Sequence, residues 1–284
     1  RADAWRARDQ RKTLRIGMGN VPNPTAGAER ETWLPSGFAR YEKDLKGRPA
    51  TLFAGLGHVQ RFPDYWELVS AGKESVNSLS AFDTDPEKTT QVDAGVVYEG
   101  SRLSASVSAF FSDVDDYILI QTGYLKGARS TTVTRNIDAR TWGGEADATY
   151  AFTARWKLTG TLAYTHGENR TDDLPLAQMP PLELRTGLDY TGTRWSAGAL
   201  WRVVAEQDRY ALRQGNIVGQ DLGRTGGFGV LSLNAGWKPA PGVLVSAGVD
   251  NLLDKLYAEH LSRGGAAVSG YEQTTRVNEP GRTL

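Results

Sequence analysis

The chain has 284 residues, and its 33 basic and 33 acidic side chains give a formal net charge of zero. It contains no cysteine, and no run of about 18 apolar residues of the kind that forms a transmembrane helix. The balanced charge, without a block of Lys and Arg, argues against nucleic acid as a partner, and the absence of cysteine fits an envelope protein that needs no disulfides.

Residues 1–35 show no sustained periodicity and contain three prolines, so we expect mostly loop with a possible strand remnant. From residue 36 onward, apolar and polar side chains alternate with a period of two, which predicts strands. The predicted strands are residues 36–45, 51–61, 91–99, 103–111, 142–150, 156–165, 182–190, 195–203, 231–237 and 243–249, with the start of one more at 281–284.

Short and long connections alternate along this series. Tight turns are predicted at residues 46–49, 99–101, 153–155, 192–193 and 239–242, and long loops at residues 62–87, 121–132, 165–180, 206–227 and 254–280. Tight turns at one end and long loops at the other are typical of outer-membrane barrels. The sequence therefore predicts an all-β fold, a transmembrane antiparallel β-barrel. A soluble all-β domain such as a propeller is the alternative.

The hairpin of residues 181–204 shows the pattern most clearly. Leu182, Leu184 and Leu188 share one face, and Tyr190 and Trp195 flank the turn, as in a lipid-facing surface with an aromatic girdle. The opposite face is polar, and we expect it to line the lumen, where it could hold a plug by ion pairs or border a solvated path; a plain solvated position is the simpler interpretation of each single residue. The predicted lumen-facing residues are Glu145, Asp147, Lys157, Glu183, Arg185, Asp189 and Arg202.

The strand count predicts that the chain is the C-terminal portion of a larger barrel. Residues 281–284 are too few to cross a membrane, which takes about 9–11 residues. An open sheet would leave unpaired edges in lipid, where each bare backbone group costs several kcal/mol. We therefore expect that the very end of the barrel is missing and that the chain alone does not make a stable membrane protein.

Three segments, in this order, resemble the TonB-dependent outer-membrane receptors. They are RFPDYWEL at residues 61–68, GVDNLLDKLY at 248–257 and EPGRT at 279–283. The residues that carry the resemblance are Arg61, Pro63, Glu67, Asn251, Asp254, Tyr257, Pro280 and Gly281. Within that family, residues 135–150, 178–190, 195–205 and 248–261 look most like the copper-receptor branch.

The resemblance implies the second half of a plugged barrel of about 22 strands in the outer membrane of a Gram-negative bacterium. It also implies the partners: outer-membrane lipid, the receptor's own N-terminal plug and first barrel half, the TonB complex acting through that plug, and a transported copper ion or metal chelate. Neither plug nor TonB box is found in this sequence. We expect no resident cofactor, copper being the substrate.

Candidate metal ligands within the chain are few. His58, His166, Met179 and His260 map near the long loops, but none stands in a paired spacing, so no ligand is assigned and the primary copper ligands are expected elsewhere in the receptor. Three scattered histidines give no nucleophile signature, and the glycines of residues 223–229 lack a phosphate-loop pattern, so no enzyme is predicted. A receptor for a siderophore or other chelate, or a passive barrel, remains the alternative function.

Overall fold

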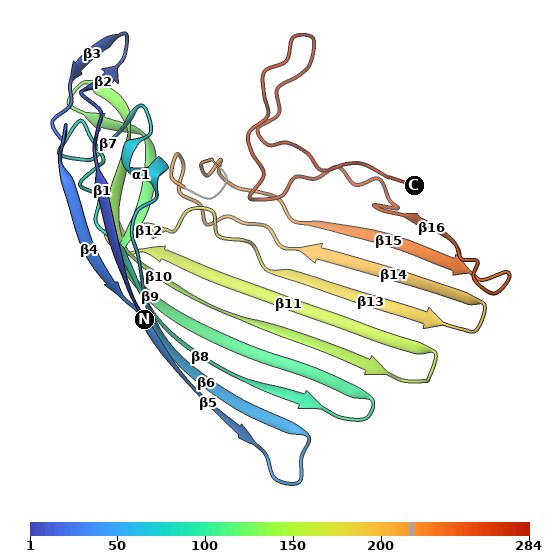
Figure 1. The fold of residues 1–284 in the computed structure, drawn as a ribbon. Helices are drawn as coiled ribbons and strands as arrows, with labels where there is room; N and C mark the ends of the chain where they lie inside the picture. The colour runs from blue at the N-terminus through green and yellow to red at the C-terminus, as the bar shows by residue number, and fades with distance from the viewer. Residues whose placement is uncertain (216–218) are drawn as a thin grey trace.

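The computed structural model describes residues 1–215 and 219–284, and most of the chain forms one antiparallel sheet (Figure 1). Each main strand pairs with the next one along the chain, which confirms the predicted antiparallel meander. The main strands, in sheet order, are β5 (Gly37–Asp44), β6 (Ala50–Arg61), β8 (Glu87–Glu99), β9 (Leu103–Lys126), β10 (Arg129–Ala151), β11 (Trp156–Asn169), β13 (Glu183–Thr191), β14 (Trp195–Val204), β15 (Phe228–Trp237) and β16 (Val245–Val249).

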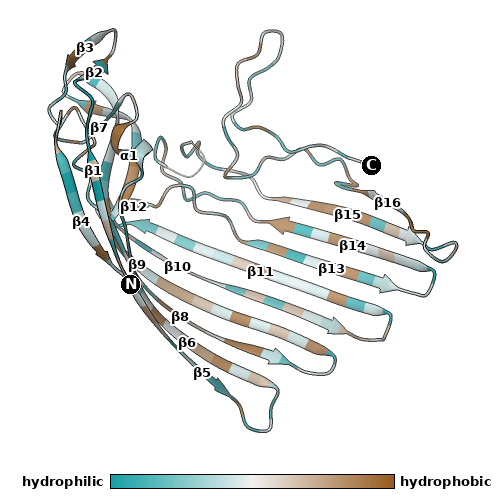
Figure 2. Ribbon diagram, in the orientation of Figure 1, coloured by the Kyte–Doolittle hydropathy of each residue, from teal (hydrophilic) through white to brown (hydrophobic). Residues whose placement is uncertain are grey.

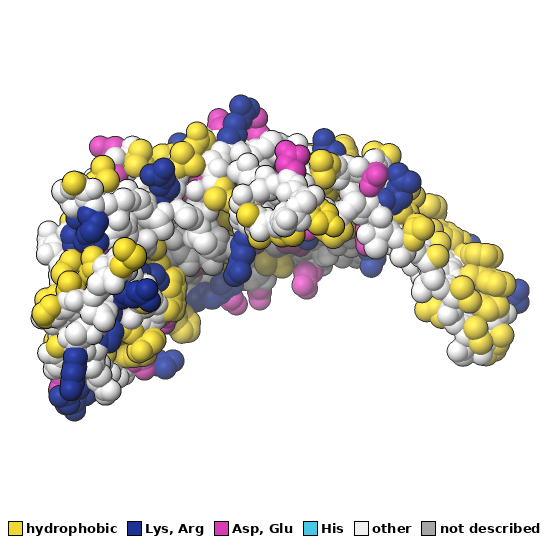
Figure 3. Space-filling model, turned by 90° about the horizontal axis from the view of Figure 1, so that it is seen from above, with side chains coloured by type: hydrophobic (Ala, Val, Ile, Leu, Met, Phe, Trp, Pro, Cys, Tyr) yellow, Lys and Arg dark blue, Asp and Glu magenta, His cyan; other side chains and the backbone are white. Residues whose placement is uncertain are grey.

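Seen from above, the molecule is an open arch (Figure 3). At the β16 edge the sheet continues in one isolated bridge between Asp250 and Thr283, where the sequence predicts the start of another strand. No helix in the described residues is long and apolar enough to cross a membrane.

Hydrophobic and hydrophilic residues are interspersed along the strands (Figure 2), and the strand register sorts them onto two faces of different chemistry. Leu162 lies opposite Ala146 on one neighbouring strand and Leu184 on the other, which builds an apolar face. One residue along, Thr161 lies opposite Asp147 and Arg185, which builds a polar face. The period of two in the sequence therefore produces the two faces directly.

Aromatic side chains border the apolar face at the tight-turn end. The ring centroids of Trp156 and Tyr190 lie 5.0 Å apart, and those of Trp195 and Trp237 lie 5.5 Å apart in a stack. Such a band is where amphipathic rings meet the polar boundary of a bilayer.

The segment 1–35 contains more strand than the sequence predicted. Strands β1 (Ala2–Arg8) and β4 (Glu29–Pro35) form one hairpin, and β2 (Thr13–Ile16) and β3 (Gly19–Pro22) form a second. The first hairpin is held by a distant contact, because the Trp5 ring stacks on Phe62 at 5.1 Å. A pattern within the segment could not supply that contact.

The predicted loop at residues 121–132 is wrong. Strands β9 and β10 run through it for 24 and 23 residues and turn only at Gly127, whose φ is 63°. At about 3.3 Å per residue, β9 is about 80 Å long, well beyond the thickness of a bilayer. This upper part is buried on both faces, with Ile118, Leu119 and Val133 at 0 %, 1 % and 0 % exposure, so its apolar run lacks the alternation of the lower sheet.

The apolar cores therefore lie above the sheet's two-faced region. Helix α1 (Tyr65–Val69) and the short strands β7 (Lys73–Glu74) and β12 (Leu174–Pro175) belong to this layer. One core contains Val114, Leu119, Ile137, Ala139 and Leu176, and the other contains Leu34, Phe62, Leu68 and Phe82. We call this part, built from residues 1–35, 62–86, 113–140, 165–182, 205–215, 219–227 and 250–280, the loop layer.

Candidate functional site

Charged residues on the polar face form a network with the loop layer. Arg202 donates to Glu183 on the adjacent strand at 2.6 Å and also pairs with Glu259 of the loop layer. Arg185 lies opposite Arg202 in the strand register and pairs with Glu183 as well. The two carboxylates thus neutralise two facing guanidinium groups, and Arg202 ties the last loop to the wall of the sheet.

A cavity of about 370 Å³ opens on the same face beneath Pro180 and Pro181. Four of the seven predicted lumen residues line it: Glu145, Asp147, Glu183 and Arg185. Of the other three, Lys157 and Asp189 lie directly opposite each other across β11 and β13, and Arg202 joins the network above. The register thus puts all seven residues on the polar face.

The structure does not bring the four candidate metal ligands together. His58 and His166 share the phase of the apolar face but belong to β6 and β11, which three strands separate. The His166 ring stacks on Trp142 at 4.9 Å, as an interfacial side chain does. Met179 lies on the other face, over Gly167 and against the Leu176 core.

His260, the fourth candidate, is buried inside the loop layer. Its Nδ1 lies 2.7 Å from the Thr225 hydroxyl, and its Nε2 lies 3.9 Å from Asp221. Burial lowers the pKa of His260 below its ordinary value, while Asp221 opposes this shift and Arg276 adds to it. Among the described residues, no group of three or more His, Cys, Asp or Glu side chains could hold a metal ion.

The first motif of the family resemblance builds a turn at the upper end of β6. Arg61 donates to Glu67 at 2.8 Å, and Glu67 in turn accepts from the backbone amide of Asp64 at 2.7 Å, at the start of α1. Glu67 is 1 % exposed and Pro63 is fully buried beside it. Arg61, Pro63 and Glu67 thus fix the fold of this turn in the loop layer.

The second and third motifs meet in space. Asn251, with φ 50°, donates from Nδ2 to the carbonyl oxygens of Lys255 at 2.9 Å and Pro280 at 3.4 Å. Asp254 accepts from the backbone amide of Arg282 at 2.8 Å. A Cβ at Gly281 would lie 2.8 Å from an Asp254 carboxylate oxygen, so a larger residue there would have to displace that carboxylate. The two motifs thus join the end of β16 to the last residues.

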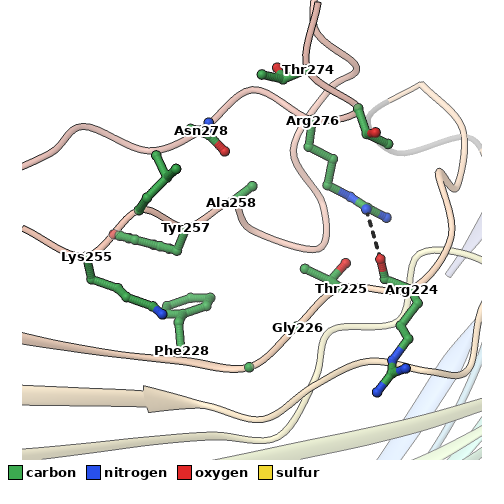
Figure 4. A pocket seen from close by; sticks show the side chains of 13 residues that line it. Arg224, Thr225, Gly226, Phe228, Lys255, Tyr257, Ala258, Thr274, Arg276 and Asn278 are labelled. Carbon is green, nitrogen blue, oxygen red and sulfur yellow. Dashed lines mark hydrogen bonds between the residues drawn. The ribbon is translucent and has the colours of Figure 1, made fainter.

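Tyr257, the remaining motif residue, lies in a second cavity of about 420 Å³ between residues 224–228 and the last loop (Figure 4). Its ring packs against Phe228 at a centroid distance of 4.2 Å, and the Arg202 guanidinium lies 5.2 Å from the Phe228 centroid. The cavity therefore adjoins the charged network of the polar face.

Several residues that organise this region carried no signal in the sequence. Glu259, Asp221 and Arg276 lie in loops without periodicity, and each has a partner that is distant in the sequence: Arg202, His260 and Gly223, respectively. A charged residue in a loop is usually solvated, so only the folded chain identifies these as buried or paired.

A family model described as TonB dependent receptor-like, β-barrel, matches residues 4–252. Among solved structures, the chain is similar to the copper transporter OprC, with a TM-score of 0.90 and 49 % identity over 99 % of this chain and 44 % of that one. The ferric enterobactin receptor PfeA of Pseudomonas aeruginosa has a TM-score of 0.65 at 20 % identity, over 89 % of this chain and 39 % of its own, which shows the fold alone.

Among curated proteins, the iron-regulated outer membrane virulence protein of Vibrio cholerae is 29 % identical over 162 residues, which are 52 % of this chain and 24 % of that protein. The chain thus spans about a quarter of this curated relative and less than half of the solved copper transporter.

Proposed function

Because the chain belongs to the TonB-dependent receptor-like β-barrel family, we propose that it forms part of the barrel of a receptor for energised uptake of copper. The barrel lies in the outer membrane of a Gram-negative bacterium, where the apolar face of the sheet contacts lipid. Copper is the transported substrate in this proposal and not a resident cofactor, and no enzymatic role is included.

One observation carries the substrate assignment: the 49 % identity with a copper transporter extends over 99 % of this chain. Identity at this level over the whole sheet and loop layer supports a shared substrate far better than the fold does. The four candidate ligands in this chain, His58, His166, Met179 and His260, lie far apart. Their dispersed positions are consistent with primary copper ligands that come from the plug and the first half of the barrel.

In this proposal the polar face lines the lumen. Glu145, Asp147, Glu183 and Arg185 border the cavity beneath residues 180–181, where charged side chains can pair with a hydrated plug. The TonB complex would act on that plug and not on this chain. The loop layer faces the medium and is the part that meets the substrate first.

The test is the metal content of the complete receptor, purified in detergent after exposure to equimolar copper, zinc, iron and nickel, measured by elemental mass spectrometry. We expect stoichiometric copper in preference to the other three metals, and copper uptake by cells that requires TonB. Met179→Leu and His166→Phe should leave the copper content unchanged, because these side chains do not converge on a site.

A receptor for a siderophore or other metal chelate is the second candidate, and the iron-regulated relative favours it. A receptor that retains no free metal but binds a ferric chelate would replace copper by this candidate. Uptake that continues without TonB would instead indicate a passive barrel.

A further inference from the structure

Three tight turns at one end of the sheet carry basic residues and no acidic ones. They connect β10 to β11, β13 to β14 and β15 to β16, and they lie at the same end of the sheet in Figure 1. Each of these turns contains one basic side chain: Arg155, Arg194 and Lys238, respectively. The chain as a whole has equal numbers of acidic and basic residues, so the positive charge of these turns is a local property.

These three cations are unmatched within the described part of the chain. All three residues are exposed, and none of them forms an ion pair with a described carboxylate. Arg194 and Lys238 also lie opposite each other at the ends of β14 and β15, where the Lys238 amide donates to the Arg194 carbonyl oxygen at 2.8 Å. Like charges directly opposite each other on neighbouring strands are destabilising. An anion bound at this position would remove that repulsion.

The basic residues lie one position beyond the aromatic band that borders the apolar face. Each is the direct sequence neighbour of a tryptophan of that band: Trp156, Trp195 and Trp237. One residue of a strand spans about 3.3 Å, so the three cations begin where the aromatic boundary of the bilayer ends and the lipid headgroups lie. Long basic side chains at such a boundary lay their methylene groups along apolar surface and keep the charge in the polar layer.

A cavity in the apolar face lies on the hydrocarbon side of the same band. Its volume is about 590 Å³, and we call it the alanine cavity because Ala197, Ala235 and Ala247 line it from β14, β15 and β16. These alanines lie opposite one another in the strand register, two residues along from the stacked pair Trp195 and Trp237 and on the same face. Bulkier side chains also line the cavity: Trp156, Leu188 and Leu233. Small side chains between large ones thus leave room for a hydrocarbon chain.

The ligand that fits both parts of this surface has an anionic head and a hydrocarbon tail. A phospholipid has this form, and its phosphate and acyl chains lie on opposite sides of the boundary that the tryptophans mark. A zwitterionic headgroup carries its own ammonium group and is neutral, whereas unmatched cations attract a headgroup with a net negative charge. The charge of the turns therefore favours an anionic phospholipid over a zwitterionic one.

We propose that the tight-turn end of β14 and β15 binds a phospholipid with an anionic headgroup. The headgroup lies at Arg194 and Lys238, and one acyl chain occupies the alanine cavity. Arg155, in the tight turn between β10 and β11, adds to the positive charge at this end of the sheet. This inference goes beyond the proposed copper uptake and depends only on the position of the barrel in a membrane, so it holds for either substrate.

The test measures lipid binding to the complete receptor in detergent by native mass spectrometry. The probes are phosphatidylglycerol and phosphatidylethanolamine with identical acyl chains, and equimolar inorganic phosphate serves as a competing anion without a hydrocarbon chain. The double variant Arg194→Gln/Lys238→Gln removes the two facing charges at exposed positions. Lys46→Gln/Arg48→Gln is the matched control, because it removes two exposed charges from a tight turn that does not adjoin the alanine cavity. Ala235→Leu fills the cavity and leaves the charge unchanged.

A Lys or Arg beside an anionic headgroup strengthens binding about fivefold, so the Arg194→Gln/Lys238→Gln variant should bind phosphatidylglycerol about 25-fold more weakly than wild type. Its binding of phosphatidylethanolamine should not change. The control should bind both lipids like wild type, and Ala235→Leu should bind phosphatidylglycerol a few-fold more weakly.

Equal binding of phosphatidylglycerol by wild type and the Arg194→Gln/Lys238→Gln variant would overturn the inference. An equal loss in the Lys46→Gln/Arg48→Gln control would also overturn it, because the attraction would then follow total charge and not this site. Displacement of the lipid by equimolar phosphate would assign the two cations to a free anion instead. Unchanged binding by Ala235→Leu would refute the place of the acyl chain in the alanine cavity.

Discussion

Glu259→Gln should loosen the last loop from the wall of the barrel. Glu259 pairs with Arg202, and the two side chains are 30 % and 21 % exposed. Truncating one partner of a buried pair costs about 3–5 kcal/mol, whereas exposed pairs contribute about 0.2–1 kcal/mol. The exposure of this pair lies between those two cases, and Arg202 retains its ion pair with Glu183 in the variant. We therefore expect a loss of about 1–2 kcal/mol in the local stability of the last loop.

The assay is amide hydrogen exchange of residues 255–265, followed by mass spectrometry on the receptor in detergent. A loss of 1–2 kcal/mol corresponds to about 5- to 30-fold faster exchange where opening is local and reversible. Glu272→Gln is the control, since Glu272 is exposed on the same loop and has no ion pair among the described residues. The same effect of Glu259→Gln in an Arg202→Met background would refute the argument, because the pair would already be absent.

Three further outcomes follow from the geometry. Burial raises the pKa of Glu74, but hydrogen bonds from Arg129, Lys126 and Thr131 outweigh it and lower the pKa from 4.5 to about 2. The ionised carboxylate should therefore contribute about 3 kcal/mol to the free energy of unfolding above pH 4.5, and this contribution is lost as the pH falls from 4.5 towards 2. Amide hydrogen exchange of residues 70–80 should show this pH dependence in the wild type and lose it in Glu74→Gln. Gly95→Val should destabilise the sheet by about 1–3 kcal/mol, seen as a lower temperature for gel-shift unfolding, because a Cβ there would lie 2.5 Å from the Phe53 ring; an unchanged temperature would contradict this. Leu162→Arg should cost about 2–4 kcal/mol in lipid vesicles, whereas an apolar Leu162→Met should cost little, and equal costs would argue against a lipid-facing position.

The lower sheet could be predicted because its physics is local. Where one face meets lipid and the other water, apolar and polar residues alternate along each strand. The faces of Leu162 and Arg185 can therefore be predicted from the sequence alone. The tight turns are marked by Gly, Pro and charged residues for an equally local reason. The same parity predicts that the seven polar residues share one face, as the strand register has them.

The loop layer could not be predicted in this way. Ile118 and Val133 are buried on both sides, so alternation vanishes and the strand resembles a loop. The Trp5 stack on Phe62 joins residues 57 positions apart in the chain, and the Arg202 pair with Glu259 also joins residues 57 positions apart. Periodicity carries no information about such contacts, and the cavity beside Lys255 exists only because two loops meet there.

The two apolar cores lie in the loop layer and not in the lower sheet, so the two parts of the chain are stabilised in different environments, water for the loop layer and hydrocarbon for the sheet. Leu34, Leu119 and their neighbours pack away from water with ordinary side-chain contacts, while Leu162 and its column need hydrocarbon that the chain does not contain. A change of detergent or lipid should therefore act on the sheet and spare the loop layer, and urea or acid should do the reverse. The stabilities of the loop layer and of the sheet should consequently respond to different solvent conditions.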